Sequence, residues 1–100
     1  MGNRSLEIEL IEAYNKAKRK FRENEEKIAT LLHSLHERRM NGEEVSRVDK
    51  EEIELKMALK NSPTLYARAD ELYHILFYKT GIYQKYPKDI YTGEIIIDKE

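Results

Sequence analysis

The sequence predicts an all-α domain: a long N-terminal helix in an antiparallel helical hairpin or three-helix arrangement, with a short C-terminal extended segment or β-hairpin. Two observations lead to this class. Apolar residues recur at spacings of three and four over the first 40 residues, which is the helical period. Glycine and proline fall almost only between the periodic segments, where they end helices. We therefore expect one domain spanning residues 1–100.

The first helix is expected from about residue 5 to residue 40, where Asn41-Gly42 supplies a left-handed stop. Its apolar residues form a heptad seam, and a helix of this length is longer than a small domain is wide. We therefore expect a homodimer in which the seams of two copies pack together. The expected seam consists of Tyr14, Phe21, Asn24, Ile28, Leu31 and Leu35. Asn24 is either a buried amide that fixes the register and partner number of a coiled coil or a polar gap at the mouth of a hairpin.

Two shorter helices are expected next. Asp49 with Glu52 three residues later resembles a capping box, which predicts a second helix over about 46–60. Ser62-Pro63 repeats the start signal, with serine as the cap and proline at the first helical position. A third helix is therefore expected over 63–80, closed by glycine at position 81.

The remaining residues, 82–100, are expected to form an extended tail. The run Ile95-Ile96-Ile97 follows Thr92-Gly93 and is typical of a short strand after a turn. Such a strand needs a partner, because an exposed apolar edge invites aggregation. It can pair within its own hairpin or with the sheet of another protein, and the sequence leaves both alternatives open.

Apolar residues outnumber the positions that one hairpin can cover. The surplus lies on the second and third helices and is rich in aromatic side chains, which are enriched at protein interfaces. The expected partner-binding residues are Ile53, Met57, Tyr66, Tyr73 and Phe77. The first functional hypothesis is therefore a non-enzymatic protein-binding or regulatory protein that acts through this surface as a homodimer.

A basic cluster provides the alternative hypothesis, a nucleic-acid-binding accessory protein. The cluster consists of Lys16, Lys18, Arg19, Lys20 and Arg22. On a helix these side chains spread over several faces, and acidic partners stand four residues away. The formal net charge of −1 also argues against a strongly basic nucleic-acid surface. We therefore rank this hypothesis second.

Chemical sites have little support in the sequence. The chain has no cysteine, which excludes thiolate metal sites and cysteine nucleophiles, and it has no glycine-rich phosphate loop. Glu71 and His74 have the spacing of a di-iron ligand pair, but both are expected on the outer side of their helix. His33 and His36 are expected at the rim of the hairpin. We therefore expect no catalytic residue, cofactor or metal.

One stretch resembles an enzyme family. Residues 31–39, Leu-Leu-His-Ser-Leu-His-Glu-Arg-Arg, are similar to the end of the first helix in the short helical chorismate mutases. The resemblance implies a long helix followed by two shorter ones and places Arg38 in the family's arginine position. Phe21 and Asp49 then stand where the family has an arginine and a lysine, and Gly42 interrupts the helix. A chorismate-mutase-like enzyme is the remote alternative.

Localisation is expected to be cytoplasmic. No segment has the apolar length of a membrane span or of a signal peptide, so no membrane partner is expected. The amide content is low, with Gln84 as the only glutamine, whereas Glu, Lys and Ile are abundant. Such a composition is typical of thermophile proteins. The small size is also compatible with a viral or mobile-element protein.

Overall fold

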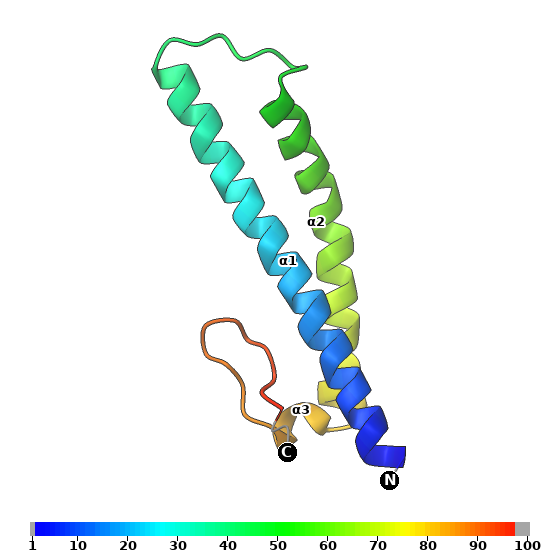
Figure 1. Cartoon of the computed structure of the whole chain (residues 1–100). Helices are drawn as coiled ribbons and strands as arrows, with labels where there is room; N and C mark the ends of the chain where they lie inside the picture. The colour runs from blue at the N-terminus through cyan, green and yellow to red at the C-terminus, as the bar shows by residue number, and fades with distance from the viewer. Residues whose placement is uncertain (1, 98–100) are drawn as a thin grey trace.

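Two long antiparallel helices dominate the computed structural model, which describes residues 2–97. The helical elements are α1 (Gly2–Met40), α2 (Lys50–His74), the π-helical turn η1 (Ile75–Lys79) and α3 (Ile82–Lys85). Figure 1 shows α1 and α2 joined by a loop at one end, with the C-terminal segment beside the N-terminal half of α1. The prediction of an all-α protein is confirmed, and residues 2–97 contain no strand. The molecule measures 61 × 21 × 20 Å.

The boundaries at the connecting loop follow local sequence signals. α1 ends at Met40, and Gly42 takes a φ of 87°, a left-handed conformation that favours glycine. α2 begins at Lys50, and the carboxylate of Asp49 accepts a hydrogen bond from the Glu51 N–H at 3.0 Å. This bond satisfies one of the free N–H groups at the start of the helix.

The helix break expected at Ser62-Pro63 is absent. One continuous helix, α2 followed by η1, replaces the helices expected over 46–60 and 63–80. Pro63 lies exposed inside α2, and the Ser62 hydroxyl donates to the Glu25 carboxylate at 2.6 Å instead of capping a helix. An interior proline costs about 3 kcal/mol, whereas each fully buried leucine contributes about 1.5–3 kcal/mol. Packing of α2 against α1 therefore outweighs the local signal.

The hydrophobic core has two parts with a polar layer between them. One part joins α1, α2, η1, α3 and the C-terminal segment through Ile11, Tyr14, Ala17, Leu72, Leu76, Ile82 and Ile95. The other joins α1 and α2 nearer the connecting loop through Ile28, Leu31, Leu35, Leu55 and Ala58. Between them Asn24 donates from Nδ2 to the backbone carbonyl of Ala58 at 2.8 Å. The amide therefore marks a polar layer between the two parts of the core, rather than a polar gap at the mouth of the hairpin.

The heptad seam of α1 is covered within the chain. Tyr14, Ile28, Leu31 and Leu35 are buried, and the ring of Phe21 contacts the ring of Tyr66 on α2 with centroids 5.6 Å apart. The sequence argument for seam-to-seam dimerisation assumed short helices that leave α1 overhanging. Because α2 and η1 together run along most of α1, most of these side chains pack against their own chain, whereas Phe21 and Asn24 stay partly exposed.

The C-terminal segment is less regular than a β-hairpin. Residues 82–97, which we call the tail, begin with α3 and then fold back along α1, with one isolated antiparallel bridge between Lys88 and Ile95. In the expected strand, Ile95 is 3% exposed and Ile96 is 48% exposed. The last three residues of the expected tail, 98–100, lie outside the described residues. A buried contact, rather than a sheet, holds the tail in place.

Replacement of Pro63 by alanine tests the balance between local and tertiary forces in α2. Pro63→Ala is expected to raise the free energy of unfolding by about 1–2 kcal/mol, because it restores an N–H donor and removes the clash with the preceding turn. The change is measured by urea unfolding followed by circular dichroism. Lys60→Ala, at a neighbouring exposed position, serves as control and is expected to stay within about 0.5 kcal/mol of wild type. A less stable Pro63→Ala variant would contradict this account.

Candidate functional site

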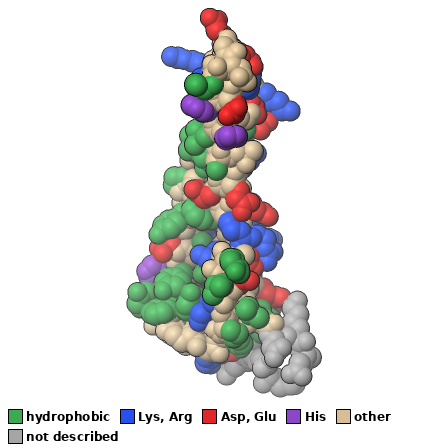
Figure 2. Space-filling view, turned by 90° about the vertical axis from the view of Figure 1, so that its left-hand side faces the viewer, with side chains coloured by type: hydrophobic (Ala, Val, Ile, Leu, Met, Phe, Trp, Pro, Cys, Tyr) green, Lys and Arg blue, Asp and Glu red, His purple; other side chains and the backbone are tan. Residues whose placement is uncertain are grey.

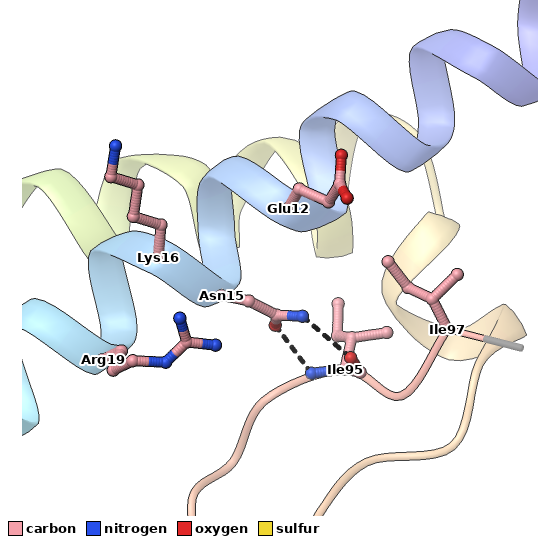
Figure 3. A pocket seen from close by; sticks show the side chains of 6 residues that line it. All are labelled: Glu12, Asn15, Lys16, Arg19, Ile95 and Ile97. Carbon is pink, nitrogen blue, oxygen red and sulfur yellow. Dashed lines mark hydrogen bonds between the residues drawn. The ribbon is translucent and has the colours of Figure 1, made fainter. Parts of the chain in front are cut away.

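The tail is anchored to α1 by the side chain of one asparagine. Asn15 donates from Nδ2 to the carbonyl of Ile95 at 2.8 Å, and its Oδ1 accepts from the N–H of Ile95 at 2.8 Å. Figure 3 shows the amide facing the backbone of the tail with both bonds drawn. The side chain thus pairs with Ile95 as a neighbouring strand would. No local pattern in the sequence indicates this contact, because its partners lie 80 positions apart.

Two arginines of α1 bind one carboxylate of the tail. Glu94 accepts hydrogen bonds from Arg19 at 2.8 Å and from Arg22 at 3.1 Å, and its side chain is only 15% exposed. The hydrogen bonds from Arg19, more than those from Arg22, hold the pKa of Glu94 below its ordinary value although burial acts in the other direction. Arg22 also approaches Glu26 at 3.8 Å. The tail therefore occupies part of the basic cluster.

The beginning of the tail is held by a separate set of polar contacts. Glu7 accepts from Lys85 at 2.8 Å and from the hydroxyl of Tyr86 at 3.1 Å. Lys88 donates to the carbonyls of Tyr83 and Tyr86 at 2.8 and 2.9 Å, and its Nζ lies 4.3 Å from the centroid of the Tyr83 ring. These contacts fix the ring of Tyr83 against the helical hairpin.

Tyr83 belongs to the lining of an open groove that is rich in aromatic rings, which we call the aromatic groove. α1 contributes Tyr14 and Phe21, α2 contributes Tyr66 and Tyr73, and the tail contributes Tyr83; Lys18, Ala69 and Asp70 complete the lining. The rings of Tyr14 and Tyr83 meet edge to face at 6.2 Å, and those of Tyr73 and Tyr83 at 5.1 Å. The groove has a volume of about 230 Å³. It is built from three segments that are distant in the sequence.

More aromatic side chains continue the groove along η1. Phe77 stacks on Tyr73 with centroids 5.4 Å apart, and Tyr78 meets Phe77 at 4.8 Å. Tyr66 and Tyr78 are 56% and 68% exposed. Figure 2 shows hydrophobic side chains gathered at this end of the molecule. Rigid aromatic rings that remain in contact with solvent are typical of binding surfaces.

Two phenol groups of the aromatic groove have raised pKa values. Burial raises the pKa of Tyr14 to about 12, and the neighbouring Tyr83 and Tyr73 add to this effect. Burial also raises the pKa of Tyr73. Both phenols therefore stay protonated at neutral pH and remain hydrogen-bond donors.

The tail also presents two apolar side chains to solvent. Ile90 and Tyr91 are 88% and 89% exposed, and we call this pair the loop tip. The carboxylate of Asp89 accepts from the N–H groups of Tyr91 and Thr92 at 2.8 and 3.0 Å, which fixes the turn. Gly93 then takes a φ of 74°, and a Cβ there would lie 2.5 Å from Cε of Lys18. The exposed pair therefore stands on an ordered turn.

The structure divides the predicted partner-binding residues between two sides of α2. Tyr73 and Phe77 lie at the aromatic groove with Tyr66. Met57 precedes Tyr66 by nine residues, about two and a half helical turns, so it faces the opposite flank of α2 together with Ile53. Ile53 and Met57 are 44% and 60% exposed. The five residues therefore form two separate surfaces.

The basic cluster is likewise divided. Arg19 and Arg22 bind Glu94, and Lys18 lies beside the aromatic groove with its Nζ 6.0 Å from the centroid of the Tyr14 ring. Lys16 and Lys20 are exposed. Lys16 and Glu12 belong to the lining of a second, polar pocket. Figure 3 shows the Lys16 side chain pointing away from the tail. The cluster therefore does not form one continuous cationic surface.

Arg38 is engaged with carboxylates at the connecting loop. It donates to Asp49 at 2.7 Å and to Glu51 at 2.9 Å, and it also pairs with Glu43. The hydrogen bonds from Arg38 lower the pKa of Asp49 to about 2. Phe21, the other position that the resemblance to chorismate mutases singles out, lies in the aromatic groove. Arg38 thus serves the loop between α1 and α2.

Comparison with protein-family models, curated proteins and solved structures finds no match. Among residues 2–97, no group of three or more histidine or carboxylate side chains could hold a metal ion. None of the described helices is long and apolar enough to cross a membrane. The assignment of function therefore depends on the geometry of the aromatic groove and the tail.

Replacement of Asn15 tests the anchor of the tail. Asn15→Leu removes two hydrogen bonds, each contributing about 0.5–1.5 kcal/mol, and is expected to lower the free energy of unfolding by about 2 kcal/mol. Hydrogen exchange of the Ile95 amide is expected to accelerate at the same time. Lys16→Leu places the same side chain at the neighbouring exposed position and is the control. Unchanged protection of the Ile95 amide in Asn15→Leu would contradict the anchoring role.

The pH dependence of stability tests the Glu94 contact. Because the folded pKa lies below the ordinary value of 4.5, the ionised carboxylate stabilises the fold above that pH, and this contribution is lost as the pH falls through the lowered pKa. The difference in stability between wild type and Glu94→Gln is therefore expected to be largest at neutral pH and to shrink toward pH 3. Urea unfolding at several pH values measures it. A constant difference would exclude a contribution from ionisation.

Proposed function

We propose that this protein is a non-enzymatic protein-binding or regulatory module whose working surface is the aromatic groove. The observation that carries the proposal is that aromatic rings from α1, α2 and the tail line one open groove. Tyrosine and phenylalanine supply large contact areas with few rotatable bonds, so they lose little conformational entropy on binding. Such residues dominate the binding energy of many protein interfaces.

The hydrogen bonds that hold the tail in place support the same proposal. Asn15, Glu94 and Lys88 hold the tail through hydrogen bonds to α1 or within the tail, and Tyr83 is fixed by them. A groove that is ordered before its partner arrives avoids part of the entropic cost of binding. Local contacts therefore prepare the surface for association.

The proposed binding surface includes only some of the partner-binding residues expected from the sequence. Tyr66, Tyr73 and Phe77 belong to the aromatic groove and its extension. Ile53 and Met57 lie on the opposite flank of α2, and exposed apolar side chains are normal on a protein surface. We therefore assign partner binding to the groove side of α2.

Nucleic-acid binding through the basic cluster has less support. Arg19 and Arg22, the two guanidinium groups best suited to phosphates, are bound to Glu94. The exposed lysines, Lys16 and Lys20, stand four residues apart on α1. Two free cations offer little of the counterion release that drives phosphate binding.

A pair of matched substitutions tests the proposed function. Tyr66→Asp places a charge in the groove, and Met57→Asp places the same charge at a similarly exposed position, 60% against 56%, on the opposite flank. A protein captured from a lysate of the source cells by the immobilised wild type is expected to bind Met57→Asp equally and Tyr66→Asp at least about tenfold more weakly.

Circular dichroism and thermal melting of both variants check that the fold persists. Equal capture by all three proteins would contradict the proposal, because the groove would then make no contact with the partner. A wild-type chain that captures nothing and stays monomeric would contradict it as well.

A further inference from the structure

The loop tip and the aromatic groove are complementary in chemistry and lie close together on the same molecule. We propose that the partner of the groove is a second copy of this chain, and that Ile90 and Tyr91 of each copy insert into the aromatic groove of the other. The inference rests on the proposed function of the groove and names its partner. It also places the expected homodimer at the aromatic groove, which shares only Tyr14 and Phe21 with the heptad seam.

The loop tip has the properties of an anchor for an interface. Ile90 and Tyr91 contact almost nothing in their own chain, since they are 88% and 89% exposed. The turn beneath them is held by Asp89, by the bound Glu94 and by the buried Ile95. A rigid turn that projects an aliphatic and an aromatic side chain loses little entropy when these side chains are buried. Ile90 and Tyr91 are the two most exposed large apolar side chains in the described chain, and their insertion into a groove would remove both from solvent.

The groove offers what these two side chains need. Its lining includes the partly exposed ring of Phe21 and the exposed ring of Tyr66, against which a further ring packs favourably, whereas Tyr14 is buried at 3% exposure. Lys18 and Asp70 also line the groove. An ammonium donor and a carboxylate acceptor can therefore satisfy the hydroxyl of an inserted tyrosine, which a purely apolar pocket would leave without partners.

The positions of tip and groove suit a two-fold dimer. In such a dimer each copy presents the same patch, so a projection and a recess must lie side by side on one face. Lys18 lies between them, because it lines the groove and its Cε would be 2.5 Å from a Cβ on Gly93, two residues after Tyr91. Tyr83 belongs to both the groove and the tail. Figure 2 shows the tail and hydrophobic side chains beside it on one side of the molecule.

The size and charge of the molecule allow this association. A stable interface buries about 800 Å² per partner, and one long side of the molecule, 61 by 21 Å, exceeds that area. A net charge of −1 brings little repulsion between two copies. Closed two-fold contacts also use both tips and both grooves, which leaves no unpaired end for further growth.

Light scattering after size exclusion over a dilution series tests the inference. Wild type and the control Met57→Asp are expected to be dimers. Tyr91→Asp removes the tip and Tyr66→Asp blocks the groove, so each is expected to be monomeric at concentrations where wild type is dimeric. Ile90→Asp is a second tip variant. Because both tip positions are almost fully exposed, these variants are expected to keep the helicity of wild type by circular dichroism.

Mixing the variants gives the decisive measurement. An equimolar mixture of Tyr91→Asp and Tyr66→Asp is expected to form a heterodimer, because the tip of the second chain still fits the groove of the first. This dimer retains one of two contacts and should dissociate at least about tenfold more readily than wild type. A chain with both substitutions has neither a tip nor a groove and should not associate with wild type.

Three results would overturn the inference: a wild-type monomer at all concentrations, a dimer that both substitutions leave intact, or a mixture that fails to form the heterodimer. Growth into open filaments would also overturn it, since closed two-fold contacts do not propagate. A further result would separate the two proposals. If the wild type is monomeric and captures another protein, and Tyr66→Asp loses this capture, then the partner is not a second copy, but the proposed function of the groove stands.

Discussion

The rest of the structure depends on the packing of α2 against the apolar seam of α1. This contact runs along the hairpin on both sides of the Asn24 layer, and it is extensive enough to keep α2 helical through Pro63. It determines which side chains face inward and therefore which ones remain outside. The aromatic rings of α2 reach solvent because the positions facing α1 are occupied by Leu55, Ala58, Leu72 and other small or aliphatic residues.

The tail depends on a different kind of interaction. Apart from Ile82 and Ile95, which are buried, it is held mainly by polar contacts with Glu7, Asn15 and the arginines of α1. Hydrogen bonds and ion pairs of partly exposed groups contribute modestly to stability, but they specify orientation strongly. The hydrophobic hairpin therefore supplies most of the stability, and the polar contacts determine where Tyr83 and the loop tip stand.

Local signals in the sequence predicted the all-α class, the end of α1 at Asn41-Gly42 and the cap at Asp49, because each depends on neighbouring residues. The same reasoning failed at Ser62-Pro63, where a valid local start signal is overridden by packing with α1. It also expected acidic partners for Arg19 and Arg22 four residues away on the same helix, whereas Glu94, more than 70 positions later, binds both.

The candidate site was predictable in composition but not in arrangement. The surplus of aromatic residues in the helices and tail was visible in the sequence, and it led to Tyr66, Tyr73 and Phe77. Which of them share a surface depends on the path of the chain: Tyr83 reaches the groove only because the tail turns back along α1. An asparagine that binds backbone atoms has no sequence pattern of its own, so Asn15 could not be identified before the fold was known.

The distribution of tyrosines gives this chain an optical property. It contains seven tyrosines and no tryptophan, and four of the seven, Tyr14, Tyr66, Tyr73 and Tyr83, line the aromatic groove. Near-ultraviolet absorption, fluorescence and circular dichroism of the protein therefore arise largely from the groove and its surroundings, with no indole signal to mask them. The unmodified chain reports spectroscopically on the state of its own binding surface.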